Sequence, residues 1–193
     1  MGRGRLEAFS DGVVAIIITI MVLELKVPHG TSFAELRPLL PVFLSYVLSF
    51  IYVGIYWNNH HHMMQLVGGV TGPILWANLH LLFWLSLVPF VTAWMGENQL
   101  HTLPVALYGG VLFMAAVAYW ILMTLLIRHE GRESALARAM GRDLKGKLSP
   151  FFYATAIGMA FVQPLVSIAL YVLVAAIWFI PDRRVERSLK AGS

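Results

Sequence analysis

A hydroxyl and a carboxylate stand side by side at the edge of an apolar stretch near the start of the chain. They are Ser10 and Asp11, in a segment from Arg5 to Pro28 whose uncharged part is only Gly12–Leu23. Twelve residues of helix cover about 18 Å, well short of the roughly 30 Å hydrocarbon core of a bilayer. A carboxylate facing lipid at mid-depth costs about 2.5 to 3.5 kcal/mol. If this segment crosses a membrane, its polar ends must therefore face protein or water.

Three consecutive histidines suggest either metal binding or pairing with a buried carboxylate. Neighbouring helix residues point about 100° apart, so the three cannot all ligate one ion, and no HExxH pair is present. We therefore expect no metal site and favour polar packing against Asp11, with a solvated loop as the alternative. The second apolar stretch ends, and the third begins, at the membrane depth of Ser10 and Asp11. The expected polar partners are Asn58, Asn59, His60, His61, His62, Asn78 and the core histidine His80.

The composition predicts an all-α integral membrane protein. The 193 residues are 59% hydrophobic and 12% charged, with a mean hydropathy of +0.72, which excludes a disordered chain. Without cysteine there are no disulfides, thiolate metal sites or thiol nucleophiles. GxSxG, P-loop and GxGxxG signatures are lacking, so we expect neither an enzyme nor a bound cofactor. The basic residues sit in loops and at the end of the chain, as in membrane proteins, and we expect no nucleic-acid partner.

The apolar stretches predict one transmembrane domain over residues 1–193 with six helices. A final stretch of about 32 residues is too long for one span, and Gln163-Pro164 near its middle favours a break. A re-entrant hairpin at this place is the alternative. The expected spans are 6–27, 38–57, 73–95, 103–127, 150–163 and 164–181, with a cytoplasmic linker at 128–149 and a cytoplasmic tail at 182–193.

The placement of lysine and arginine predicts the orientation. With the N-terminus inside and six spans, twelve of the 14 basic residues are cytoplasmic, and only Lys26 and Arg37 lie outside. We therefore expect a multi-pass protein of the plasma membrane with both termini in the cytoplasm. The basic linker 128–149 has helical spacing and is expected to lie on the inner membrane surface, against anionic lipid.

The first apolar segment has two special faces when it is drawn as a helical wheel. Ser10 points to nearly the opposite side from a narrow group of residues about 60° wide, and Asp11 lies about 80° or more from that group. We expect Ser10 and Asp11 to lock this helix to its own subunit. The narrow group, called the stripe below, consists of Gly12, Ile16, Thr19 and Leu23.

The seven residues from Arg5 to Asp11 read RLEAFSD and match RxxxFSD, the signature of the transmembrane protein 175 family of potassium channels. The match includes its place at the start of the first span, and the expected layout resembles single-repeat prokaryotic members over essentially the whole chain. The resemblance implies a homotetramer in which four first helices surround a pore. The signature residues that it carries over are Arg5, Phe9, Ser10 and Asp11, and the pore constrictions are Ile16, Thr19 and Leu23.

The function implied by the resemblance is passive, potassium-selective conduction without a carbonyl filter, and the chain indeed has no TVGYG. Its partners are then K⁺ and other monovalent cations, further copies of itself and the lipid bilayer. Ile16 would form an apolar neck and Thr19 would supply hydroxyls to a partly dehydrated ion. The triple histidine has no secure counterpart in the family pattern. Ordinary helix packing is the alternative for the stripe, and a proton- or ion-coupled secondary transporter using Asp11 and the histidines is the alternative function. No inverted repeat supports it.

Overall fold

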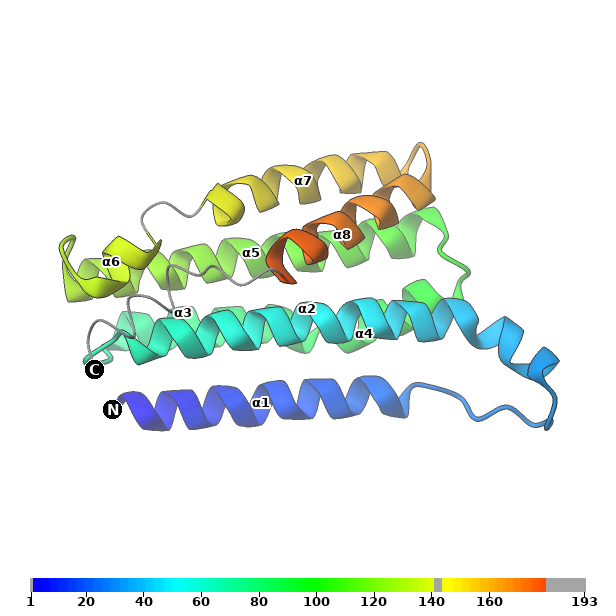
Figure 1. The fold of residues 1–193 in the computed structure, drawn as a ribbon, viewed down its shortest axis with the longest axis horizontal. Coiled ribbons are helices and arrows are strands. Elements are labelled where there is room, and N and C mark those ends of the chain that lie inside the picture. Colours follow the sequence, from blue (N-terminus) through cyan, green and yellow to red (C-terminus); the bar gives the residue numbers. More distant parts are fainter. Residues whose placement is uncertain (1, 141–143, 180–193) are drawn as a thin grey trace.

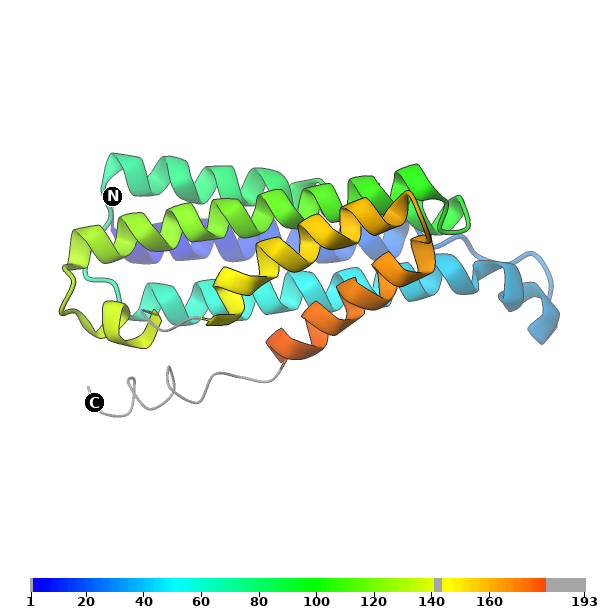
Figure 2. The same ribbon diagram turned by 90° about the horizontal axis from the view of Figure 1, so that it is seen from above.

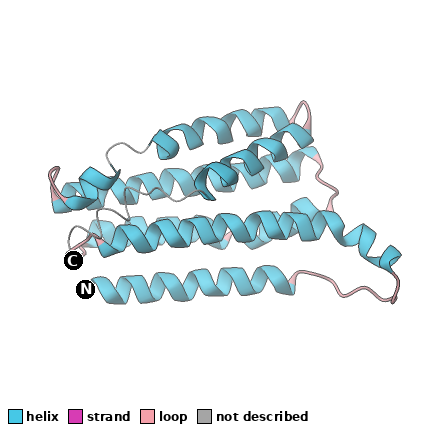
Figure 3. Ribbon diagram, in the orientation of Figure 1, coloured by secondary structure: helices cyan, strands magenta, loops and turns pink. Residues whose placement is uncertain are grey.

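The computed structural model describes residues 2–140 and 144–179, and Figure 3 shows helices joined by loops over these ranges. The predicted tail 182–193 and residues 141–143 of the predicted linker lie outside the described residues. The elements are α1 (Arg3–Leu23), η1 (Phe33–Leu39, a 3₁₀ helix), α2 (Leu40–Gln65), α3 (Gly72–Ser86), α4 (Val88–Glu97), α5 (Thr102–Glu130), α6 (Ala135–Met140), α7 (Leu144–Ala160) and α8 (Pro164–Phe179).

The helices lie side by side in layers, which Figure 1 shows with α1 at one side and the α7–α8 hairpin at the other. α1 packs on α2, α3 and α4, while α5 lies between α3–α4 and α7–α8. α3 and α4 follow one another with a break at Leu87. Pro89 explains it, since proline has no N–H and its ring clashes with the carbonyl four residues earlier. The layering leaves α1 covered on one side only.

Four helical stretches among the described residues are long and apolar enough to cross a membrane: Arg3–Leu23, Phe33–Gln65, Gly72–Glu97 and Thr102–Glu130. α7 and α8 are shorter apolar helices joined by a turn at 161–163, with Pro164 opening α8, where its missing N–H is harmless. α2 runs from residue 40 to 65, past the end of the membrane span expected at 38–57, and α5 continues to Glu130. The end of α5, all of α6 and the start of α7 therefore occupy much of the predicted linker 128–149.

The centre of the bundle is built from tyrosines whose hydroxyls bind inside the protein. Tyr52 Oη donates to the Tyr171 carbonyl (2.6 Å), and Tyr171 Oη donates to the Val105 carbonyl (3.2 Å). The Ser49 hydroxyl lies 2.6 Å from that of Thr92 and 3.0 Å from that of Tyr108. A hydroxyl in hydrocarbon has no water to bind, so these contacts between helices are what allow it to be buried.

Gly109 on α5 is expected to be indispensable for packing against α8. An added Cβ would meet Tyr171 Cζ at 2.7 Å and Ile157 Cγ1 at 2.9 Å. Gly109→Ala should therefore destabilise the protein by about 1 to 3 kcal/mol, as overpacking does. Gly110→Ala is the control, because a Cβ there meets nothing within 4 Å. Thermal unfolding in detergent, followed by loss of the monodisperse chromatographic peak, measures both variants. Equal midpoints would show that α5 and α8 are not in close contact here.

Candidate pore-lining helix and its anchors

One face of α1 is fixed to the rest of the subunit. Its buried residues recur every three or four positions, the spacing of a single helix face. This face packs on α2, α3 and α4. The buried residues are Leu6, Ser10, Val14, Ile17 and Met21.

The stripe lies on the other side of α1. Ile16 is 58% exposed and Leu23 is 80% exposed, and Gly12 and Thr19 are exposed as well. At about 100° per residue, the centre of the stripe is roughly 150° from the centre of the buried face. None of the residues that the structure describes therefore covers the stripe.

The Thr19 hydroxyl is oriented by its own helix. Its Oγ1 donates to the Ile16 carbonyl at 2.9 Å, as threonine often does in helices. A hydroxyl that uses its hydrogen in this way keeps its oxygen lone pairs as acceptors. The exposed oxygen can therefore act as a ligand for a cation.

Ser10 begins a buried hydrogen-bond chain that joins three helices. Its Oγ donates to the Leu6 carbonyl (2.8 Å) and accepts from Asn78 Nδ2 (2.9 Å). Asn78 Oδ1 lies 2.8 Å from His60 Nε2, and since an amide oxygen can only accept, His60 donates. All three side chains are at most 5% exposed. This hydrogen-bond chain links α1 to α3 and α2 and fixes the rotation of α1.

Asp11 has a different partner from the predicted asparagines and histidines. Trp57 Nε1 donates to Asp11 Oδ1 at 2.9 Å, so an indole of α2 replaces the expected amide or imidazole. Trp57 was not among the predicted site residues. A signal was available in the sequence, because Trp57 lies four residues before His61, an expected partner of Asp11, and therefore on the same face of the helix. The two rings stack with centroids 6.0 Å apart.

His61 pairs with a signature-segment carboxylate that was not among the predicted site residues. Its Nδ1 donates to Glu7 Oε1 at 2.9 Å, and its Nε2 accepts from Gln65 Nε2 at 2.8 Å. This arrangement requires the ring to carry its proton on Nδ1. Glu7, His61, Trp57 and Asp11 thus form a second contact between α1 and α2, beside the Ser10 chain.

Two of the other predicted polar partners bond within their own helices. Asn59 Nδ2 donates to the Ile55 carbonyl, and His80 Nε2 accepts from Trp84 Nε1 within α3. Asn58 is exposed, and the His62 ring lies 5.9 Å from that of His61. In the described part of the chain, no group of three or more His, Cys, Asp or Glu is arranged to hold a metal ion.

Both ends of α1 are also tied down. At the N-terminal end, Arg3 Nη1 donates to the Val67 carbonyl at 3.0 Å, and the same α2–α3 turn is bound by Glu130, which accepts from Gly68 N. At the C-terminal end, Lys26 Nζ donates to Glu97 Oε1 at 2.6 Å. This hydrogen bond raises the pKa of Lys26. α1 is thus held at both ends and along one face, with the stripe left outward.

We expect Asn78→Ala to weaken the attachment of α1. The change strands the Ser10 and His60 partners in a buried site, at a cost of about 1 to 3 kcal/mol. Asn58→Ala, at an exposed position, is the matched control and should leave stability unchanged. Thermal unfolding and the fraction of fully assembled protein measure the effect. If Asn78→Ala altered only ion preference in a normally assembled protein, the hydrogen-bond chain from Ser10 to His60 would have a role other than anchoring α1.

The sequence was compared with known proteins. The model of the family described as endosomal/lysosomal potassium channel TMEM175 matches residues 5–89, which contain the RxxxFSD segment. A potassium channel of Chryseobacterium sp. (strain P1-3) is 59% identical over 190 residues, covering 98% of this chain and 99% of the relative. The chain belongs to the TMEM175 family. The predicted family is therefore confirmed.

Further TMEM175 comparisons agree in fold. The crystal structure of a lysosomal potassium-selective channel TMEM175 homolog from Chamaesiphon minutus superposes with a TM-score of 0.81 at 29% identity, over 92% of this chain and 96% of that one. A potassium channel of Streptomyces collinus is 33% identical over 184 residues, or 89% of each chain. The prediction of an all-α membrane protein is thus confirmed, and TMEM175 membership places it among ion channels rather than enzymes.

Proposed function

We propose that this protein is a passive potassium channel whose pore lies on the axis of a homotetramer and is lined by α1. The observation that carries the proposal is the uncovered stripe of α1, opposite the face that is fixed to the subunit. Membership of the TMEM175 family, with relatives named as potassium channels, supports potassium as the permeant ion. A single stripe encloses nothing, whereas four copies related by rotation enclose a channel.

The surface beside the stripe suits a neighbouring subunit. A groove of about 760 Å³ runs between α1 and α4, and its lining is mainly apolar, with Ile17 and Ile20 on α1 and Phe90 and Trp94 on α4. Glu24, Ser86 and Glu97 also line it. Ile16 borders the same groove. A neighbouring copy that fills this groove would bring its own stripe beside the first.

Permeation in this arrangement depends on rings of side chains. Four Ile16 side chains form an apolar neck that excludes water when narrow, so an ion crosses only when the neck widens. Four Thr19 oxygens one turn further replace part of the lost hydration, which favours K⁺ because it is easier to dehydrate than Na⁺. Leu23 adds an outer apolar ring, and Gly12 leaves the inner approach wide. We further propose the plasma membrane as the location, with both termini in the cytoplasm.

Cysteine cross-linking tests the assembly, and the natural chain offers a background without cysteine. Leu23→Cys is expected to give oxidation-dependent dimers, since stripe residues of neighbouring subunits meet at the axis. Phe161→Cys, which is also exposed but lies in the α7–α8 turn on the far side of the bundle, is the control and should not cross-link. Mass measurement in mild detergent should give four chains. A monomer that carries full potassium flux would contradict the proposal.

A further inference from the structure

The segment between α1 and α2 projects past the rest of the bundle. Residues 24–32 leave the end of α1 and lead into η1, which lies beyond the ends of the other helices in both Figure 1 and Figure 2. We call residues 24–39 the arm. No residue of η1 is buried within the subunit. The arm is therefore a surface element that the described part of its own chain leaves uncovered.

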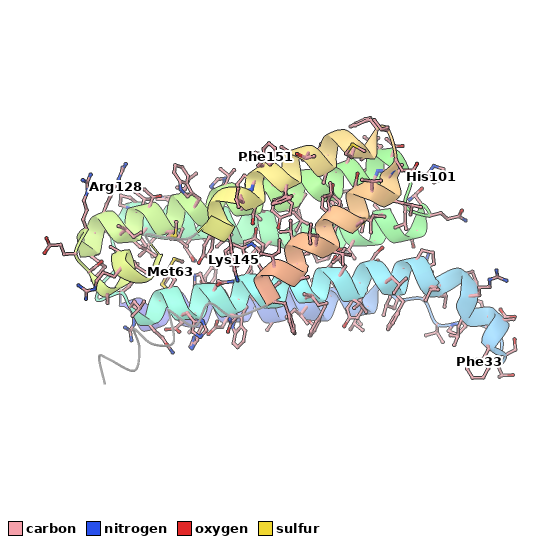
Figure 4. The ribbon with its side chains drawn as sticks, turned by 45° about the horizontal axis from the view of Figure 1, so that its top comes forward. Phe33, Met63, His101, Arg128, Lys145 and Phe151 are labelled. Atoms are coloured by element: carbon pink, nitrogen blue, oxygen red, sulfur yellow. The ribbon has the colours of Figure 1, made fainter. Side chains whose placement is uncertain are left out.

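The arm exposes large apolar side chains. Phe33 is 91% exposed and Val27 is 82% exposed, and Leu36 is half exposed. Figure 4 shows Phe33 at the tip of the arm, away from the helix bundle. Apolar side chains that gather on one exposed surface mark a contact with another molecule.

The hydrocarbon of a bilayer does not suit this surface. Two carboxylates and two basic side chains flank Phe33 within the arm, and charged groups are costly to place in the bilayer core. They are Glu24, Lys26, Glu35 and Arg37. The arm therefore lies outside the hydrocarbon core, so protein rather than lipid tails is the cover that suits its apolar side chains.

A pocket of about 370 Å³ lies between the start of the arm and the start of α2. Its lining is Leu25, Lys26, Pro28, Leu36, Leu39, Leu40, Val42 and Phe43. Of these residues only Lys26 is charged, and its Nζ is already bound to Glu97. Pockets of roughly 300 to 1,000 Å³ hold whole small molecules, so this one has room for a phenyl ring. Phe33 of the same chain is not among the lining residues.

The exposed ring and the pocket can meet only between two copies that face in the same rotational sense. Such a contact joins different surfaces of the two copies, and it closes into a ring when the copies are related by rotation. The arm leaves directly from α1, the helix that we place around the axis, so four arms come together near that axis. Their two acidic and two basic side chains balance, so they meet without accumulating charge of one sign.

We propose that Phe33 of each subunit inserts into the arm pocket of the next subunit, so that four arms form a closed ring around one mouth of the pore. The partner is thus a second copy of this chain, and each pocket is incomplete without it. An aromatic anchor in an apolar pocket is a common centre of protein interfaces. The inference rests on the tetramer proposed above and adds a contact that the pore itself does not require.

Disulfide cross-linking of the full-length protein tests the contact. In the natural cysteine-free chain, Phe33→Cys combined with Phe43→Cys should give, on oxidation, a reducible ladder of two, three and four linked chains. Each single variant should stay as single chains. Phe33→Cys combined with Phe161→Cys is the matched control, because Phe161 is 65% exposed at the same end of the bundle but on the side away from α1 (Figure 1). This pair should not link.

The effect on assembly is measured separately. Phe33→Ala should raise about tenfold the protein concentration at which half of the tetramers dissociate in mild detergent, while Phe33→Leu should keep most of the wild-type stability. Phe161→Ala is the control and should dissociate as the wild type does.

Two results would overturn the ring of arms while leaving the proposed channel intact. One is a Phe33→Cys/Phe43→Cys variant that remains as single chains in protein that mass measurement shows to be tetrameric. The other is equal dissociation of Phe33→Ala and Phe161→Ala, as expected if Phe33 lies against lipid headgroups instead. A wild-type protein that carries full potassium flux as a monomer would overturn both the ring and the proposed function.

Discussion

Ile16→Asn is expected to turn the channel into a wetter and less selective one. Four amides would stand where four sec-butyl groups had excluded water, so the neck stays hydrated and an ion passes it without widening. We expect the potassium conductance to rise by about tenfold, equal to roughly 1.4 kcal/mol of barrier, and the potassium-to-sodium permeability ratio to fall toward 1. Single-channel recording in planar bilayers, with reversal potentials under bi-ionic conditions, measures both quantities.

Ile20→Asn is the matched control for this change. Ile20 is 42% exposed and lies four residues further along α1, where it lines the groove between α1 and α4 rather than the stripe. In protein that still assembles, the same substitution there should leave the reversal potential where it is in the wild type. An unchanged reversal potential and conductance in assembled Ile16→Asn protein would show that the stripe packs against protein and does not face the pore.

Thr19→Val is expected to lower potassium preference while keeping the neck dry. The two side chains have nearly the same shape, but the variant has no oxygen to replace water lost by the ion. The Thr19 hydroxyl donates to the Ile16 carbonyl, so its removal subtracts an acceptor that faces outward. We expect the potassium-to-sodium permeability ratio to fall about three- to tenfold, equal to roughly 0.7 to 1.4 kcal/mol. Bi-ionic reversal potentials measure the change.

Thr124→Val on α5 is the control for the loss of a hydroxyl. Thr124 makes the same type of bond, from its Oγ1 to the Trp120 carbonyl at 2.8 Å, but on a helix that we place away from the pore. It should keep the permeability ratio of the wild type. A similar fall in both variants would point to a general effect on the bundle, and no fall in Thr19→Val would remove the hydroxyl from the selectivity mechanism.

The sequence predicts features that depend on local periodicity and composition. The family, the helical membrane fold and the two faces of α1 follow from RxxxFSD, from apolar runs and from a helical wheel. α2 continues to residue 65, eight residues beyond the end of the membrane span expected at 57. Hydropathy marks where a helix leaves the bilayer, whereas its hydrogen bonds continue to Gln65, after which the N–H groups of Leu66 and Val67 bond only three residues back.

The specific partners of α1 are harder to predict. Ser10 can be placed near Asn78 and His60 by depth alone, but the choice of Trp57 for Asp11 and of His61 for Glu7 depends on how α2 is rotated against α1. That rotation is set by packing with α4 and α8 as well, through contacts between residues far apart in the sequence. A wheel drawn for one helix does not contain this information.

The short α7–α8 hairpin also has a consequence for the surrounding bilayer. Helices of 17 and 16 residues extend about 25 Å, whereas the 29 residues of α5 extend about 44 Å. Lipids beside the hairpin meet a protein surface thinner than a typical hydrocarbon core of about 30 Å, and lipids beside α5 do not. The hydrophobic mismatch is therefore uneven around each subunit. We therefore expect the bilayer to be thinner beside the hairpin than beside α5, so that a change in membrane thickness acts unevenly on the protein.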